Sequence, residues 1–157
     1  FDLKGEEICH VGTSNDSPHG ALLNDPDGFY LTRRVDALGT YDAYRKFHVG
    51  ESGMPVAEND VYTKVNVCDS KEDEAALVST RELPVTVFDA DGSRKEEKLP
   101  AGTKYYVRAT DLESFVDMEL SDGRRCRLAV KKSDKGWGFE IDGVYEEDCF
   151  EFIPYAG

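Results

Sequence analysis

The stretch Phe115–Val130, FVDMELSDGRRCRLAV, decides the fold class of this chain. Apolar and polar residues alternate on both sides of its central Ser-Asp-Gly, which is the pattern of two half-buried β-strands. A two-residue turn would place charged residues opposite apolar ones, whereas a three-residue loop at 121–123 keeps the two faces separate. The three-residue loop predicts four pairs: Val116 with Leu128, Met118 with Cys126, Asp117 with Arg127, and Glu119 with Arg125. Gly123 supplies the left-handed residue that ends such a loop, and the arginines are expected to pair with carboxylates rather than to bind a ligand.

Further hairpins are predicted by Asp-Gly steps, because both residues tolerate the positive φ angles of tight turns. The steps lie at Asp27-Gly28, Asp91-Gly92, Asp122-Gly123 and Asp142-Gly143. The last is expected to be a two-residue turn that pairs Ile141 with Val144. Strands are predicted at 29–35, 60–68, 85–88, 99–109 after a Pro-Ala-Gly turn, 137–141 and 144–145. The sum is a mostly β, antiparallel protein.

Other segments are less regular. Residues 40–49 fit a strand or a helix, and residues 9–28 and 50–60 are interpreted as long loops. One short helix is predicted at 71–80, because Ser70 can cap it and acidic residues fill its first turn. In the strand that ends at 109, the alternation places Tyr105, Val107 and Ala109 inward and Tyr106 and Arg108 outward.

The composition narrows the classes of partner. The chain has 157 residues and a formal net charge of −13, from 32 acidic and 19 basic side chains. Without a basic field it is a poor binder of nucleic acid or of anionic membrane surfaces. No apolar run approaches the roughly 20 residues of a membrane span, so membrane insertion is not expected. The charge is compatible with cations, basic peptides or neutral sugars, and its simplest role is solubility.

The cysteines do not form a recognisable metal or redox motif. They are Cys9, Cys68, Cys126 and Cys149, with no C-x-x-C spacing. Their even number permits two disulfides in an exported protein, but such sparse cysteines are also common as buried free thiols. The first residue is Phe1 rather than Met, and we expect that the chain is a processed mature form or a trimmed one.

The segments Leu99–Val107, LPAGTKYYV, and Phe115–Gly123 together resemble bacterial SH3-like domains, in which a Gly-Thr step opens a strand and an aromatic residue begins the next. The resemblance implies a small antiparallel barrel at 82–157, with 85–88 as its first strand and 89–98 as the long loop after it. Residues 1–81 would then be a second small β unit or an elaboration of the same core. Phe115 stands where the family usually has Trp, and the family's closing strand is replaced by a longer tail, which puts its binding groove in doubt.

The resemblance also implies a function. Such modules are non-enzymatic, belong to exported or cell-surface bacterial proteins, and bind peptides or cell-wall fragments. This places the chain outside the cell or in the cell envelope, with no cofactor, and leaves its oligomeric state unknown. The candidate binding residues are three aromatic side chains and four acidic ones: Tyr106, Phe115, Trp137, Asp89, Asp91, Glu96 and Glu97. The competing interpretation places Trp137, Phe139, Phe150 and Phe152 in the core.

Two other functions stay open at this stage. Cys9 with His19 or His48 could form the nucleophile–base pair of a hydrolase, although no catalytic motif surrounds Cys9. The chain could also be a purely structural docking domain. No metal site is predicted, because the Asp89–Gly92 stretch places neither its glycine nor a glutamate where a calcium loop requires them.

Overall fold

The computed structural model describes residues 2–4, 7–9, 22–65, 74–89, 91–134 and 136–156, which are mostly antiparallel β-structure. The strands are β1 (Asp2–Lys4), β2 (Glu7–Cys9), β3 (Leu22–Asp25), β4 (Gly28–Asp36), β5 (Thr40–Val49), β6 (Pro55–Ala57), β7 (Tyr62–Lys64), β8 (Leu77–Val78), β9 (Leu83–Phe88), β10 (Arg94–Leu99), β11 (Lys104–Thr110), β12 (Phe115–Leu120), β13 (Arg125–Ala129), β14 (Lys131–Lys132), β15 (Phe139–Ile141) and β16 (Val144–Tyr145). The helical content of these ranges is the single 3₁₀ turn Glu146–Asp148. None of the helices described is long and apolar enough to cross a membrane.

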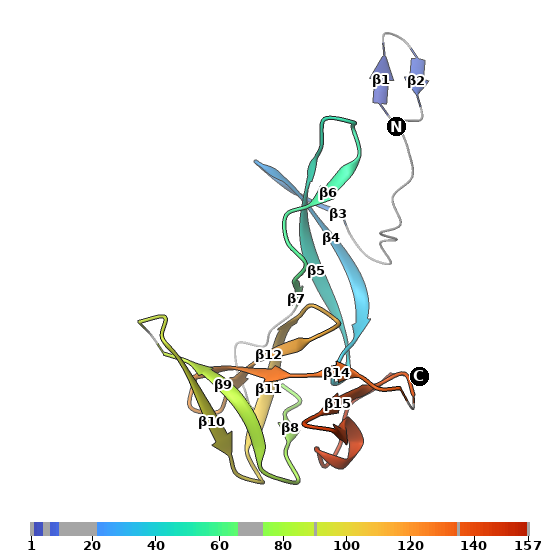
Figure 1. Cartoon of the computed structure of the whole chain (residues 1–157). Coiled ribbons are helices and arrows are strands. Elements are labelled where there is room, and N and C mark those ends of the chain that lie inside the picture. Colours follow the sequence, from blue (N-terminus) through green and yellow to red (C-terminus); the bar gives the residue numbers. More distant parts are fainter. Residues whose placement is uncertain are drawn as a thin grey trace.

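One sheet of 11 strands runs through both halves of the sequence, in the order β10-β9-β13-β12-β11-β7-β5-β4-β3, with β6 beside β5 and β8 beside β11. Two small sheets, β1-β2 and β14-β15-β16, are separate from it. Figure 1 shows that β3–β6 form an arm, which projects from a body made of β8–β16. Among the described strands, the path of the main sheet ends at β10 and at β3 and does not close into a barrel.

The body is built around one apolar core. Tyr105, Leu128 and Phe150 are fully buried in it, and the rings of Tyr105 and Phe150 meet edge to face with centroids 6.1 Å apart. Ala37 and Leu38, from the turn between β4 and β5, belong to the same core. The N-terminal half of the sequence therefore contributes to the core of the body as well as to the arm.

The hairpin predicted at 115–130 is confirmed in register. β12 and β13 form all four predicted pairs, and Gly123 has a φ angle of 88°. The Asp117 carboxylate accepts two hydrogen bonds from the Arg127 guanidinium, at 2.6 and 2.8 Å. The turn between β15 and β16 also has the predicted pair, Ile141 with Val144, and residues 40–49 form strand β5.

The helix predicted at 71–80 is wrong in the part that the structure describes. Residues 71–73 lie outside the described residues, but Leu77–Val78 form β8 and pair with Lys104 and Tyr105. Leu77 is buried in the body core, so packing outweighs the local capping signal. Strands also occur in both predicted loops, because β3 lies within 9–28 and β6 within 50–60.

The alternation predicted along β11 fails at a β-bulge. Its register with β12 shifts between Val107 and Ala109. Tyr105, Tyr106 and Val107 are all buried, and Ala109 is only half-buried. A bulge adds one residue to a strand and re-aims the side chains that follow it, which a strict two-residue period does not anticipate.

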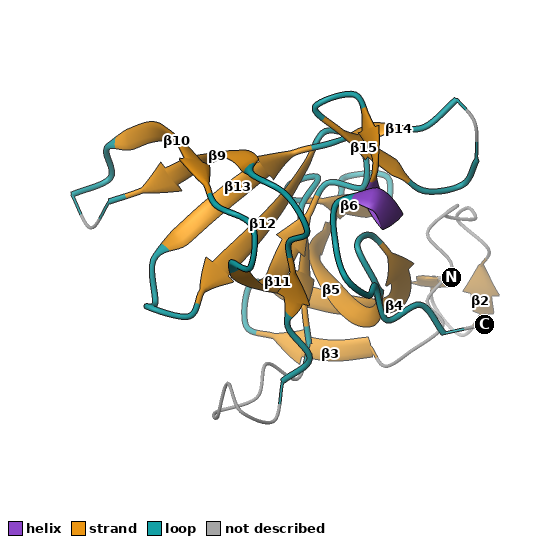
Figure 2. Ribbon diagram, turned by 90° about the horizontal axis from the view of Figure 1, so that it is seen from below, coloured by secondary structure: helices purple, strands orange, loops and turns teal. Residues whose placement is uncertain are grey.

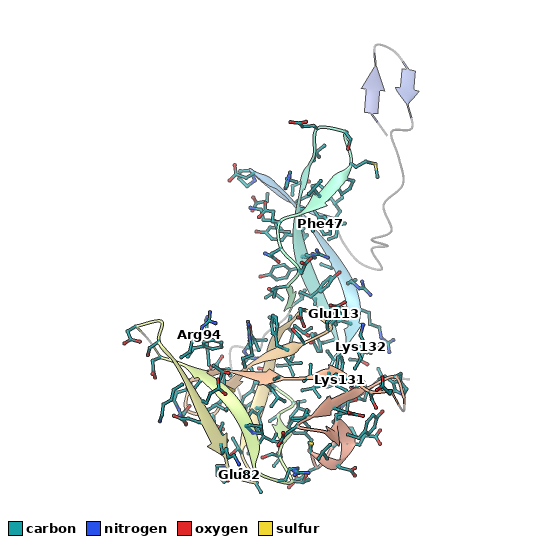
Figure 3. All side chains as sticks on the ribbon, in the orientation of Figure 1. Phe47, Glu82, Arg94, Glu113, Lys131 and Lys132 are labelled. Atoms are coloured by element: carbon teal, nitrogen blue, oxygen red, sulfur yellow. The ribbon has the colours of Figure 1, made fainter. Side chains whose placement is uncertain are left out.

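Aromatic and cationic side chains pack on both faces of the arm, and Phe47 is buried among them. Phe29 stacks on Phe47 with centroids 5.9 Å apart, and on the opposite face Tyr30 meets Tyr44 edge-on at 5.3 Å. The Arg45 guanidinium lies 5.6 Å from the centre of the Phe47 ring. Contacts of these kinds contribute about 0.5–1.5 kcal/mol each. Figure 3 shows Phe47 in the arm, well away from the body.

The acidic stretch that follows Phe88 is a turn and a strand rather than a loop. The turn closes with a hydrogen bond from the Asp89 N–H to the Ser93 carbonyl, and Gly92 has a φ angle of 84°. Strand β10 then begins at Arg94 and pairs along its whole length with β9. The predicted long loop at 89–98 is therefore corrected to a hairpin that projects from one side of the body (Figure 1).

Candidate functional site

A hollow of about 810 Å³ lies across strands β9, β13, β12 and β11, which run side by side in the body (Figure 2). Charged and aromatic side chains line it, including Phe88, Asp89, Arg108, Asp117, Arg124 and Arg125. Successive residues of a strand point to opposite faces of a sheet. Because Val87, Met118 and Cys126 belong to the core, Phe88, Asp117 and Arg125 lie on the face directed away from it. We call this the outer face.

A stack of alternating arginine and aromatic side chains crosses the outer face. The Arg127 guanidinium lies 3.5 Å from the centre of the Phe115 ring and 5.7 Å from that of Phe88. Arg94, which Figure 3 shows at the β9–β10 hairpin, covers Phe88 from the neighbouring strand at 5.6 Å. Asp117 holds Arg127 in place from β12. The stack therefore joins four strands into a rigid floor beside the hollow.

A buried ion network forms another wall. Glu74 accepts hydrogen bonds from Lys64 of β7 and Arg108 of β11, both at 2.7 Å. Arg108 also donates to Glu119 of β12 at 3.1 Å. Burial alone would raise the pKa of Glu74, but the hydrogen bonds from Arg108 and Lys64 outweigh it and lower the pKa. Arg108 is thus fully engaged and serves the structure rather than a ligand.

Arg125 and Asp89 are more accessible to a ligand than the neighbouring Arg124. Arg124 pairs with Asp122 at 2.8 Å and with Glu97 at 3.3 Å. In contrast, Arg125 is exposed and forms no salt bridge with any residue that the structure describes, so the expected charge pair with Glu119 is not formed although the two residues are in register. Asp89 is also exposed; its carboxylate accepts a hydrogen bond from the Ser93 hydroxyl. The hollow is therefore lined by an exposed guanidinium and an exposed carboxylate as well as by Phe88.

The acidic candidates from the sequence divide between the hollow and the β9–β10 hairpin. Asp89 lines the hollow, and Asp91 accepts a hydrogen bond from the Ser93 N–H in the turn. Glu96 accepts one from the Thr86 hydroxyl. Glu97 pairs with Lys95 at 2.9 Å as well as with Arg124. Asp89 is thus the member of this group that lies in the hollow.

The aromatic candidates do not form one surface. Phe115 lies under Arg127 in the stack. Tyr106 is on the outer face as expected, but only 5% of it is exposed, and Arg108 covers its ring at 5.7 Å. Trp137 is 65% exposed in the segment between β14 and β15, where it contacts Tyr155 with ring centroids 4.4 Å apart. The expected core position of Trp137 is wrong, as it is for the exposed Phe152, whereas Phe139 and Phe150 are buried as expected.

Sequence reasoning missed the members of the site that come from other strands. Arg125, Phe88 and Arg94 meet because β9 pairs with both β13 and β10, which places the three side chains in one row. The β12–β13 hairpin register was predictable, but its placement against β9 was not. The sequence does contain one signal for these residues: the alternation along each strand identifies the side chains that point away from the core.

The described cysteines are poor nucleophiles. Cys126 and Cys149 are free and buried, and burial raises the pKa of both, to about 12 for Cys126. Cys68, His19 and the side chain of Cys9 lie outside the described residues, while His48 is exposed on β5. Within the described ranges, no three His, Cys, Asp or Glu side chains are grouped to hold a metal ion.

Glu146 is a buried carboxyl that the sequence did not mark. One of its oxygens accepts a hydrogen bond of 2.6 Å from the Tyr155 hydroxyl, and the other has no partner. It packs so closely on Gly138 that a Cβ there would lie 2.3 Å from Oε1. Burial raises its pKa. Such a carboxyl can be a catalytic acid, but Glu146 is inaccessible to solvent. We infer that its hydrogen bond with Tyr155 holds the C-terminal segment in place.

The Glu146→Gln variant is expected to become more stable relative to the native protein as the pH rises from 5 to 8. The folded-state pKa of Glu146 lies above the ordinary value of 4.5, so its stabilising protonated form is lost as the pH rises through the folded pKa. Glutamine stays neutral. Urea denaturation at both pH values measures the difference. The exposed Glu151→Gln serves as the control, and an unchanged difference for Glu146→Gln would contradict the assignment.

Comparison with protein-family models, with curated proteins and with solved structures finds no match for this chain.

Proposed function

We propose that this chain is a non-enzymatic binding module and that its ligand is a peptide, or the peptide part of a cell-wall fragment. The observation that carries the proposal is the hollow on the outer face, where Arg125 and Asp89 are exposed near the Phe88 ring. A guanidinium binds carboxylates through paired hydrogen bonds, and a carboxylate binds amino or basic groups. A short peptide segment carries both kinds of group.

The resemblance to bacterial SH3-like domains is compatible with this proposal. In the order β10-β9-β13-β12-β11, the five strands β9–β13 lie next to one another in the sheet, as they would in a small barrel, although the path stays open. By this resemblance, the chain belongs to an exported or cell-surface protein, and residues 1–81 are an elaboration of the same core, to which Ala37, Leu38 and Leu77 belong. The arginine–aromatic floor also favours binding, since Asp117 holds Arg127 in an ion pair and Arg127 in turn stacks on Phe115.

The proposal is tested by titrating the isotope-labelled full chain with two probes, followed by NMR of its backbone amides. The probes are short peptides with a free C-terminal carboxylate and a lysine side chain, and soluble muropeptides. We expect the largest shifts at Phe88, Asp89 and Arg125. Fluorescence of Trp137 would be a poor reporter, because that side chain contacts Tyr155 and does not line the hollow.

The Arg125→Glu variant should weaken peptide binding by at least about tenfold, because it removes the guanidinium and adds a repelling charge. Lys131→Ala is the matched control, since Lys131 is an exposed cation on β14, outside the hollow. Equal binding by Arg125→Glu and the native chain, or shifts confined to other strands, would overturn the assignment. Absence of shifts with either probe would overturn the proposal itself.

A further inference from the structure

The tip of the arm gathers exposed apolar side chains. Six large hydrophobic residues are exposed among the described residues, and four of them are at the tip: Leu22, Leu23, Val49 and Val56. Leu22 is 59% and Leu23 is 51% exposed. They lie on β3, at the edge of the main sheet, while Val49 and Val56 lie on β5 and β6, beyond β4. Large apolar side chains that are exposed side by side on an edge strand, as Leu22 and Leu23 are, mark a surface for contacts.

The two ends of the main sheet differ in how they are protected. At one end, β10 carries Arg94, Lys95 and Lys98, and charged residues on an edge strand prevent another strand from pairing with it. At the other end, β3 has the sequence Leu-Leu-Asn-Asp and pairs only with β4 among the described strands. Asp25 is the charged residue of β3 and pairs with Lys46 at 3.1 Å, so the edge at Leu22 and Leu23 lacks charges like those of β10.

The two leucines of β3 lie on opposite faces of the sheet. Leu22 is in register with Leu31, and Leu23 is in register with Tyr30. A strand added beside β3 would place its own side chains alternately on these two faces and cover both leucines. Its backbone would pair with the outer edge of β3. The edge thus suits an extended segment better than a helix or a flat surface.

The charge at the tip selects the occupant. Segments 22–31 and 46–58 contain four acidic residues, Asp25, Asp27, Glu51 and Glu58, and one basic residue, Lys46. Lys46 pairs with Asp25 at 3.1 Å and lies 3.8 Å from Glu58. A second copy of this chain would bring the same negative charge to the contact, on a molecule whose net charge is −13. The complementary occupant is basic.

We propose that the outer edge of β3 docks an extended segment of a partner protein in which consecutive apolar residues are flanked by basic ones, and that this segment adds to the sheet as a further strand. The apolar side chains cover Leu22 and Leu23, and the basic side chains lie near Asp25 and Asp27 at the end of β3. This surface is at the tip of the arm and is separate from the hollow on the body (Figure 1). The proposal therefore goes beyond the peptide site on the outer face.

The probe is a ten-residue synthetic peptide, blocked at both ends, in which four valines lie between two groups of three lysines; it is titrated into the isotope-labelled full chain. We expect amide shifts concentrated at 22–31. A peptide in which glutamate replaces lysine, and a peptide in which lysine and valine alternate so that its valines all lie on one face, should bind at least about tenfold more weakly. Binding of the glutamate peptide as tight as that of the lysine peptide, or no shifts at 22–31, would overturn the proposal.

Variants separate this surface from the hollow. Leu22→Lys combined with Leu23→Lys should weaken binding at least about tenfold, while the amide spectrum of the body stays unchanged because both side chains are exposed. Arg125→Glu should bind the lysine–valine peptide as the native chain does, even if it loses peptides from the hollow. Equal binding by the double variant would overturn the proposal. The proposal would also be overturned if the native chain sedimented as a dimer and the double variant as a monomer, because a second copy of this chain would then cover β3.

Discussion

Replacing Arg108 by methionine is expected to lower the free energy of unfolding by about 3 kcal/mol. Arg108 lies between two carboxylates, Glu74 and Glu119, and the Glu74 side chain is only 3% exposed. Removing one partner of a buried ion pair typically costs about 3–5 kcal/mol, because the remaining charge stays without compensation. The lower end of this range applies here, since Lys64 still pairs with Glu74 at 2.7 Å. Methionine keeps the volume of the arginine stem, so the loss reports the charge.

Urea denaturation of the full chain measures this loss. Arg125→Met is the matched control, because Arg125 is an exposed arginine on β13, on the far side of β12, and should change stability by no more than about 0.5 kcal/mol. The double replacement of Arg108 and Glu74 by methionine should recover part of the loss, since it removes the buried charge together with its partner. A loss of less than about 1 kcal/mol for Arg108→Met would contradict the network.

The loss should have a structural consequence as well. Glu74 joins Lys64, on the strand that connects the arm to β11, with Arg108 on β11 itself. Without Arg108, hydrogen exchange should increase at Thr63 and Thr110, which lie where β7 and β11 pair. Exchange at the β12–β13 turn should change less, because the pairs of that hairpin do not involve Glu74.

Replacing Phe150 by alanine is expected to destabilise the protein by about 3–5 kcal/mol, because it removes a buried aromatic ring and leaves a cavity. Phe150 is 2% exposed and packs edge to face on Tyr105 in the middle of the body core. Its backbone also forms a β-bridge with Ser79, which joins the C-terminal segment to β8. The substitution therefore weakens the core and this junction together.

Phe152 provides a matched control two residues away. It is 72% exposed, so Phe152→Ala should change stability by no more than about 0.5 kcal/mol. Phe150→Leu should cost less than Phe150→Ala, since leucine fills part of the same volume. Thermal and urea unfolding of the four proteins give the comparison. Similar losses for Phe150→Ala and Phe152→Ala would mean that the C-terminal segment does not pack as the structure has it.

Only part of the candidate site could be predicted from the sequence. The outward direction of Asp117, Glu119, Arg125 and Arg127 followed from alternation, because a half-buried strand must place its apolar residues on one side. Their partners did not follow. Arg127 pairs with Asp117 as predicted, but it also stacks on Phe115 and Phe88 from two other positions in the sheet. Such contacts depend on which strands become neighbours.

The sequence by itself determined the local structure where two independent signals agree. At 115–130 the alternation and the Asp-Gly turn favour the same register, because a shift of one residue would expose every apolar side chain. The two-residue turn at Asp142-Gly143 follows from the same logic. A mostly β, antiparallel protein was predictable from these segments alone.

Only the tertiary structure decided the features that depend on distant partners. Leu77–Val78 became a strand because β11 and the core accept it, although its flanking residues favour a helix. The arm stands as a single layer because β4 and β5 are long enough to carry stacked aromatic and cationic side chains beyond the body. Short-range patterns report which side of a strand is apolar, whereas the neighbour of each strand is set by packing between segments far apart in the chain.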